Sequence, residues 1–238
     1  MITPTVHTSD TDEEAAQALA TALAADVLDG KQDILLLLSG GSALDILEYL
    51  PIPDDATFLT ISVIDERDDP TRETSNFHTL ERARWFQEMV SRGALFIDPL
   101  HSINVTKEAK AESFGRAIRQ WKETHGSGHI IAVLGMGQDG HTMGVLPSAD
   151  EETFTELFLG ARRFVAHTVH DAPSCPDRIT ATFTFLQNDV NAVYCYICGE
   201  PKREPLRRAL SGTVPLHELP IGIIATLPAV QVFTDLRL

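Results

Sequence analysis

The sequence predicts an open, mainly parallel α/β sheet of Rossmann-like type, with helices on both faces. Three observations lead to this class. Continuous apolar runs of strand length, such as residues 34–38, are bounded by turn residues, as in strands buried on both faces. Helical patterns alternate with these runs along the chain. No linker, repeat or low-complexity segment divides the 238 residues, so we expect a single domain over residues 1–238.

Capping residues and hydrophobic periodicity predict the individual elements. Asp10 or Thr11 caps a first helix that runs to Leu28, and Gly30 closes it. Further helices are expected at residues 43–50, 77–90, 108–123, 151–159 and 202–210. Strands are expected at residues 34–38, 57–64, 129–134, 164–169, 179–185 and 193–198, with strand character also at 221–226 and 230–233.

The charge of the chain argues against two classes of partner. There are 34 acidic and 19 basic residues, which give a formal net charge of -15. Such a field repels nucleic acid and anionic lipid, so we expect neither as a partner. No apolar run approaches the roughly eighteen residues of a membrane span, and residues 1–16 lack the pattern of a signal peptide. We expect a cytoplasmic protein that is a monomer or a small homo-oligomer.

Three cysteines cannot build a disulfide framework, which favours a reducing compartment. Cys195 and Cys198 have the C-x-x-C spacing of redox and zinc sites. They stand in a β-branched and aromatic run, however, and residues i and i+3 of a strand point to opposite faces. We therefore interpret them as buried structural thiols. The nine histidines are scattered without a helical ligand spacing such as H-E-x-x-H, so no metal site is predicted.

Three polar loops follow predicted strands, at residues 39–42, 65–67 and 135–141. In open α/β sheets, ligands bind at the carboxyl ends of the strands. In the first loop, Gly40, Gly41 and Ser42 offer backbone N–H groups at a helix N-terminus, where the helix dipole favours an anion such as phosphate. In the third loop, glycines allow close approach to a ligand, and His141 can exchange protons near neutral pH. The loops therefore predict an enzyme.

Two other kinds of site fit these loops less well. Gly135-x-Gly137-x-x-Gly140 matches the dinucleotide fingerprint and follows a strand, but Pro147 comes where a long helix should be running. A nicotinamide or flavin is therefore not predicted, nor is any other cofactor. The serine-hydrolase elbow G-x-S-x-G is absent, because Ser42 follows two glycines and precedes Ala43.

Five motifs resemble, in order and spacing, those of the 6-phosphogluconolactonase family. They are Ser39-Gly40-Gly41-Ser42, Asp65-Glu66-Arg67 with Ser75-Asn76-Phe77, Gly135-Met136-Gly137-Gln138-Asp139-Gly140-His141-Thr142, Arg178-Ile179-Thr180 and Gly199-Glu200-Pro201-Lys202. The resemblance implies the fold of the sugar-phosphate isomerase type. It also implies hydrolysis of 6-phospho-D-glucono-1,5-lactone to 6-phosphogluconate, a step of the oxidative pentose phosphate pathway. The superfamily also contains glucosamine-6-phosphate deaminases.

Two positions favour the lactonase. Deaminases resemble one another in a Glu-Pro pair after the loop histidine, and Leu146 stands here in the place of that glutamate. The second motif ends in Arg67, as in lactonases, where deaminases have tyrosine. The sequence departs from the usual lactonase pattern at Ala43 and Leu44, and in the exit of the third motif at residues 143–147, where the usual Ala-Ser-Leu-Phe-Pro becomes Met-Gly-Val-Leu-Pro. These positions shape the pocket. Two alternatives to the lactonase are a deaminase or isomerase of the same fold and a non-catalytic sugar-phosphate-binding protein.

The resemblance implies a role for each motif residue. His141 would take a proton from the attacking water and return one to the departing ring oxygen, without a metal. Asp139 would orient the imidazole or contact substrate hydroxyls, unless it only caps its own loop. The other expected substrate-binding residues are Gly40, Gly41, Ser42, Asp65, Arg67, Gly137, Arg178 and Lys202. The resemblance implies that some of the three basic residues contact the substrate, and a guanidinium suits the forked geometry of its phosphate. For each of the three alone, a surface ion pair is the commoner explanation. Asp65 and Glu66 are alternatively expected to hold Arg67 in place.

Overall fold

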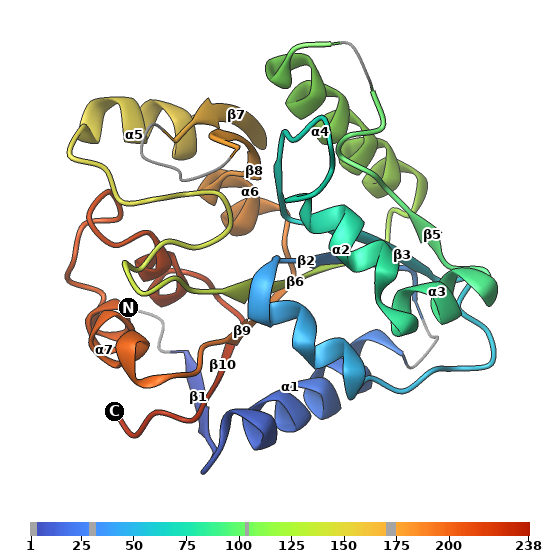
Figure 1. Cartoon of the computed structure of the whole chain (residues 1–238), viewed down its shortest axis with the longest axis horizontal. Helices are drawn as coiled ribbons and strands as arrows, with labels where there is room; N and C mark the ends of the chain where they lie inside the picture. Colours follow the sequence, from blue (N-terminus) through green and yellow to red (C-terminus); the bar gives the residue numbers. More distant parts are fainter. Residues whose placement is uncertain (1–3, 29–31, 103–104, 170–174) are drawn as a thin grey trace.

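The larger of two sheets has seven strands, all parallel, in the order β1-β10-β9-β6-β2-β3-β5 (Figure 1). The computed structural model describes residues 4–28, 32–102, 105–169 and 175–238. The strands of this sheet are β1 (Thr5–Thr8), β2 (Ile34–Leu38), β3 (Leu59–Val63), β5 (Leu95–Phe96), β6 (His129–Gly135), β9 (Ala192–Tyr196) and β10 (Val230–Thr234). The predicted α/β class with a mainly parallel sheet is confirmed.

Helices cover both faces of this sheet (Figure 1). One face carries α1 (Asp12–Val27), the 3-10 helix η1 (Gly41–Glu48), α2 (Asn76–Arg82) and α3 (Arg84–Ser91). The other carries α4 (Lys107–Thr124), α5 (Glu151–Phe158), α6 (Phe183–Asn188), α7 (Arg203–Ser211) and the 3-10 helix η3 (Pro220–Ala225). The apolar run of β2 is continuous because both of its faces are buried. Leu36 packs into the core on the face covered by α1, whereas Leu35 and Leu37 pack into the core on the face covered by α4.

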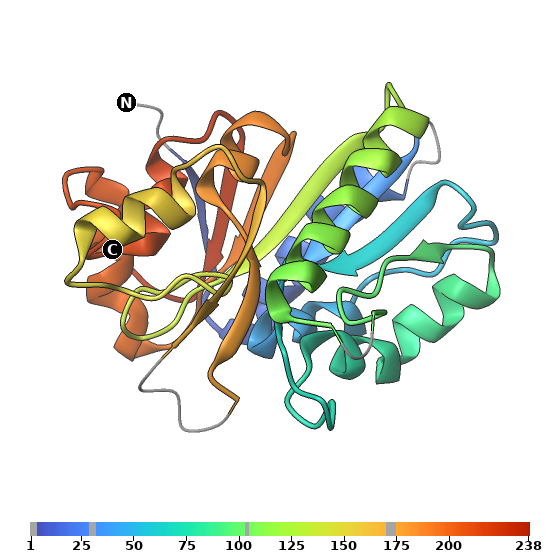
Figure 2. The same ribbon diagram turned by 90° about the horizontal axis from the view of Figure 1, so that it is seen from above.

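A second, three-stranded sheet is antiparallel, in the order β4-β8-β7. Its strands are β4 (Asp65–Arg67), β7 (Phe164–Thr168) and β8 (Asp177–Ala181), and β7 and β8 pack against α4 (Figure 2). Residues 65–67, expected as a loop, therefore form a short strand. The strand expected at 179–185 ends at Ala181 because Thr182 caps α6, accepting a hydrogen bond from the Phe185 N–H at 3.2 Å.

Several other boundaries differ from the expectation. Thr11, rather than Asp10, caps α1, and its hydroxyl accepts from the Glu14 N–H at 3.1 Å. The helix expected at 77–90 is broken at Ala83, whose backbone is extended. The segment at 221–226 forms η3 instead of a strand, and β1 and β5 were not expected. Gly30 lies outside the described residues.

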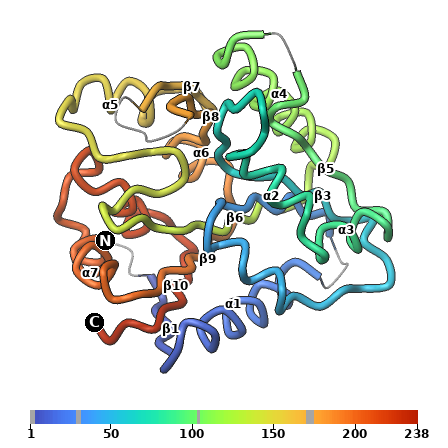
Figure 3. Tube along the Cα trace, in the orientation of Figure 1, coloured from blue at the N-terminus to red at the C-terminus, as the bar shows by residue number. Residues whose placement is uncertain are grey.

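The two ends of the chain pair with each other. Strand β1 lies in parallel register with β10, so that Val6 faces Val232 across the pair. In Figure 3, β1 and β10 lie side by side, close to the C-terminal end of the trace. The pairing places β10 inside the sheet and leaves the four-residue β1 as the edge strand.

The cysteines are separate thiols in the structure. Cys195 on β9 is buried, whereas Cys175 and Cys198 are only partly so. Over the described ranges, no three histidine, cysteine or acidic side chains come together as metal ligands would. Nor does any helix in those ranges have the length and apolar character that crossing a bilayer requires.

Candidate active site

The loops after β2 and β6 enclose a cavity of about 170 Å³. These strands are neighbours, but the chain leads from β2 toward β3 on one side and from β6 toward β9 on the other. Such a switch point opens a crevice at the carboxyl ends of the strands. The cavity is lined by Ser39, Gly40, Gly41, Ser42, Asp65, Arg67, Gly135, Met136, Gly137, His141 and Met143. Most of the predicted site residues are thus brought together, from three separate motifs.

Asp139 fixes the imidazole of His141. The Nδ1 atom of His141 lies 2.6 Å from Oδ1 of Asp139, which also accepts the backbone N–H of His141 at 3.1 Å. An ionised carboxylate can only accept, so Nδ1 carries the ring proton and Nε2 keeps a lone pair. The hydrogen bond from His141 lowers the pKa of Asp139, which therefore stays ionised at neutral pH. The imidazole is held in one tautomer, with Nε2 able to accept a proton.

The third motif can close on itself only because Gly137 lacks a side chain. A Cβ there would lie 2.2 Å from both Cε1 and Nδ1 of His141, and 2.6 Å from Oδ1 of Asp139. The Gly137 N–H donates to the His141 carbonyl at 2.9 Å, and the Gly140 N–H donates to the Gly137 carbonyl at 3.1 Å. Gly140 has a φ of +84°, which favours glycine. Gly137 thus makes room for the imidazole on the cavity wall.

Arg67 and Arg178 lie opposite each other on β4 and β8. Neither forms an ion pair with a carboxylate of the described residues. Arg67 donates to the Thr74 carbonyl at 2.8 Å, while Arg178 donates to the backbone carbonyls of Cys175 and Asp177. Burial, together with the charge of Arg67, lowers the pKa of Arg178. Two guanidinium groups without a carboxylate partner, one of them on the cavity wall, favour an anionic ligand.

The acids of the second motif lie behind these arginines. Glu66 is fully buried. Its two oxygens accept hydrogen bonds of 2.7–2.9 Å from the N–H groups of Arg67, Asn76 and Phe77 and from the hydroxyl of Ser75. Glu66 therefore holds the backbone of Arg67 and the start of α2. Burial raises the pKa of Glu66 to about 7, against the four hydrogen bonds, and also raises the pKa of Asp65.

Gly40 allows the first motif to pack closely against Asn76 of the second motif. A Cβ on Gly40 would lie 2.0 Å from Oδ1 of Asn76, so only glycine leaves room for that amide. Asn76 in turn donates to the carbonyl of Asp65 at 2.9 Å and to its carboxylate at 3.2 Å. Asn76 therefore packs closely against the loop after β2 while its amide is hydrogen-bonded to Asp65 of β4.

Ser39 is a cavity residue that the sequence analysis did not single out. It is 4% exposed, and its Oγ has no hydrogen-bond partner among the described residues. A buried hydroxyl without a partner costs about 1–3 kcal/mol, so this group is available to a molecule in the cavity. The signal in the sequence was its place directly after the apolar run of β2, at the start of the first motif.

Lys202 is not among the residues that line the cavity. It ends the 3-10 helix η2 (Glu200–Lys202), beyond the carboxyl end of β9, near Cys198 and Asp235. Burial lowers the pKa of Lys202, and its ammonium group forms no ion pair within the described ranges. It lies at the same edge of the sheet as the cavity, and its contact with the substrate stays a prediction.

Comparison with known proteins agrees with this geometry. A profile of the family described as glucosamine-6-phosphate isomerases/6-phosphogluconolactonase matches residues 8–232. The chain belongs to this family. The 6-phosphogluconolactonase of Mesorhizobium japonicum is 30% identical over 198 residues, which cover 78% of each chain. That of Neisseria meningitidis serogroup A is 27% identical over 226 residues, which cover 92% of each.

A solved structure from the same family has the same fold. The crystal structure of a 6-phosphogluconolactonase from Shewanella baltica superposes with a TM-score of 0.78 and 25% identity, covering 97% of this chain and 96% of that one. The resemblance inferred from the five motifs, and the expectation of an enzyme of this family, are therefore confirmed.

Proposed function

We propose that the protein hydrolyses 6-phospho-D-glucono-1,5-lactone to 6-phosphogluconate, a step of the oxidative pentose phosphate pathway. The observation that carries this proposal is that one cavity is lined both by the imidazole of His141, held through Nδ1 by Asp139, and by the guanidinium of Arg67, which forms no ion pair among the described residues. The first group can move a proton and the second can bind a phosphate. The names of the relatives support the lactone as the substrate.

In this mechanism His141 acts first as a base and then as an acid. Its Nε2 takes a proton from water while the water oxygen attacks the carbonyl carbon of the lactone. When the bond between that carbon and the ring oxygen breaks, the imidazolium gives its proton to the ring oxygen. Asp139 stabilises the imidazolium and keeps Nε2 toward the substrate, because it binds the Nδ1 proton throughout.

The loop after β2 is suited to the charge that develops on the carbonyl oxygen. The N–H groups of Gly40 and Gly41 donate to no backbone acceptor of the described residues. Gly41 has a φ of +65° and no atom within 4 Å of where its Cβ would be, which leaves its backbone open to a ligand. We propose that these N–H groups stabilise the oxyanion, and that Ser39 and Ser42 bind sugar or phosphate oxygens.

The chemistry described needs neither a metal nor another cofactor, because a proton-transfer base and hydrogen-bond donors supply each step. We place the protein in the cytoplasm, as its three free thiols suit a reducing compartment.

The direct test mixes the protein with freshly prepared δ-lactone of 6-phosphogluconate and measures the rate of acid release above the spontaneous rate. Rapid, saturable acid release supports the lactonase. Binding of 6-phosphogluconate without acid release would instead favour a non-catalytic sugar-phosphate-binding protein.

Glucosamine 6-phosphate is expected to release no ammonia above background. Leu146 is apolar and half-buried, and no acid stands in the place where a deaminase has its glutamate. A coupled ammonia assay checks this, with a known deaminase as the positive control. Ammonia release by the unmodified protein would overturn the lactonase, since another residue would then supply the missing acid.

Replacing Arg67 by alanine is expected to weaken binding of 6-phosphogluconate by about 1.5–3 kcal/mol, the range for hydrogen bonds to a charged group. Alanine at Arg178 is expected to have a similar effect, because the two arginines face each other across β4 and β8. Alanine at Lys202 is expected to have a smaller effect, because Lys202 lies in η2, away from the β4–β8 pair that carries both arginines. Calorimetry measures each affinity, and non-phosphorylated gluconolactone is the control. An arginine whose loss weakens the binding of both ligands equally has a structural role instead.

A further inference from the structure

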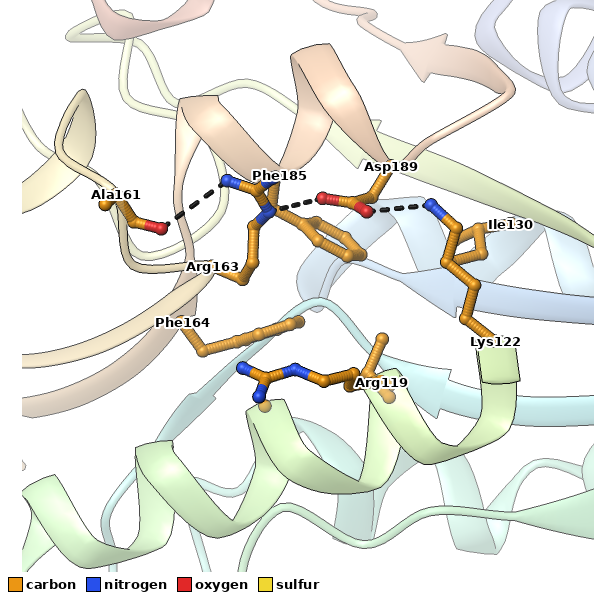
Figure 4. A pocket seen from close by; sticks show the side chains of 10 residues that line it. Arg119, Lys122, Ile130, Ala161, Arg163, Phe164, Phe185 and Asp189 are labelled. Atoms are coloured by element: carbon orange, nitrogen blue, oxygen red, sulfur yellow. Dashed lines mark hydrogen bonds and ion pairs between the residues drawn. The ribbon is translucent and has the colours of Figure 1, made fainter. Parts of the chain in front are cut away.

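A groove of about 480 Å³ lies between α4 and the start of β7, away from the catalytic cavity and larger than it (Figure 4). Its floor is apolar and includes the buried rings of Phe164 and Phe185, whose centroids are 4.9 Å apart. The groove also reaches Ile130, near the beginning of β6, whereas the His141 loop follows the end of that strand. The two cavities are therefore at opposite ends of β6.

Three basic side chains, Arg119, Lys122 and Arg163, surround the groove, and the last two share one acid. The carboxylate of Asp189 forms ion pairs with Nζ of Lys122 at 2.8 Å and with Nε of Arg163 at 2.5 Å. Figure 4 shows Arg119 on α4, across the groove from that cluster. Arg119 has no hydrogen bond or ion pair with the described residues. The chain has a net charge of -15, so a groove with an excess of positive charge and no acid for Arg119 is complementary to an anion from outside.

Gly115 keeps the groove open. It stands within the 18-residue helix α4, where glycine lowers helix stability relative to other residues. A Cβ at this position would lie 3.5 Å from Cδ2 of Phe164, an ordinary contact. Packing alone would therefore allow alanine here. A longer side chain would instead extend over Phe164, where the groove is now empty.

We propose that this groove is a second ligand site, which takes an anion carried on a flat apolar body, such as an aryl phosphate. The guanidinium groups of Arg119 and Arg163 match the forked geometry of a phosphate and can also stack on a flat ring. The apolar floor provides contact for that ring. The volume falls within the range of about 300–1,000 Å³ that is typical of small-molecule pockets.

The test uses 1-naphthyl phosphate, whose own fluorescence reports binding through its anisotropy. The unmodified protein is expected to bind it at one saturable site, and more tightly than 1-naphthol or inorganic phosphate, which each compete through only half of the contacts. Arg119→Gln should weaken binding about tenfold, the loss expected for a hydrogen bond to a charged group. Arg208→Gln is the matched control, because Arg208 is an exposed helical arginine without an ion pair in the described ranges and its loss changes the net charge equally.

The variant Gly115→Met tests the contribution of the groove's shape without changing its charge. Methionine favours the helix more than glycine does, so the unfolding temperature should not fall, while its side chain fills the groove and binding should be lost. Arg67→Ala, in the catalytic cavity, should bind the probe as the unmodified protein does. The proposal is overturned if no saturable binding occurs, if Gly115→Met and Arg119→Gln bind normally, or if Arg67→Ala abolishes binding and so places the probe in the catalytic cavity. None of these outcomes depends on lactone hydrolysis.

Discussion

Replacing His141 with asparagine should lower kcat for the phosphorylated lactone by about a hundredfold or more, the scale of general acid–base catalysis. Asparagine keeps a polar group in the loop but cannot exchange a proton. The affinity for 6-phosphogluconate should change little, because the proposed phosphate contacts come from β4 and β8. Steady-state kinetics, corrected for spontaneous hydrolysis, gives kcat, and calorimetry gives the affinity.

The chain contains a matched control for this substitution. His125 is also paired with an aspartate, since its Nδ1 lies 3.0 Å from Asp33, but it lies beyond the far end of α4. His125→Asn should therefore leave kcat unchanged. Near wild-type turnover in His141→Asn would remove His141 from the mechanism and leave its pairing with Asp139 as a structural feature of the loop.

The sequence predicted the site because parallel strands place their carboxyl ends at one edge. The five consecutive apolar residues of β2 could only belong to a strand buried on both faces, and the run before Gly135 had the same character. Once both were strands of one parallel sheet, the loops that begin at Ser39 and Gly135 had to emerge at the same edge. The cavity between them follows from that arrangement.

The second sheet could not be predicted in this way. Strand β4 has only three residues, too few for a periodic pattern, and it pairs with β8 more than a hundred residues later in the chain. The opposition of Arg67 and Arg178 depends entirely on that register. Their proximity was therefore implied only by the resemblance to the family, not by any local pattern.

The strand predicted at 221–226 was wrong because the composition of this segment fits two structures. Its isoleucines favour a strand, but Pro220 begins a 3-10 helix whose residues are all buried in the core. The Ile221 N–H donates to the Gly140 carbonyl at 3.0 Å, so this helix supports the catalytic loop. Tertiary contacts of that kind outweigh local propensity and leave no trace in the segment itself.

Replacing Gly137 with alanine should lower kcat by about a hundredfold, because displacing a catalytic group by about 1 Å has effects of that size. The new Cβ would lie 2.2 Å from the imidazole of His141, so the ring must move away from Asp139 or out of the cavity. Gly135→Ala is the matched control, since Gly135 lines the same cavity but the nearest atom to its Cβ position, in Ala43, is 3.7 Å away. It should retain most of the activity.

The Gly137→Ala variant also tests whether the geometry of the loop, rather than the presence of histidine alone, sets the rate. The substitution leaves every proton-exchanging group in place, so a fall in kcat with unchanged affinity for 6-phosphogluconate points to the position of the imidazole. NMR of the imidazole should then show that the hydrogen bond from Nδ1 of His141 to Asp139 is lost, while the unfolding temperature stays close to that of Gly135→Ala. If kcat in Gly137→Ala equals that of Gly135→Ala, the 2.6 Å contact between His141 and Asp139 is not what orients the base.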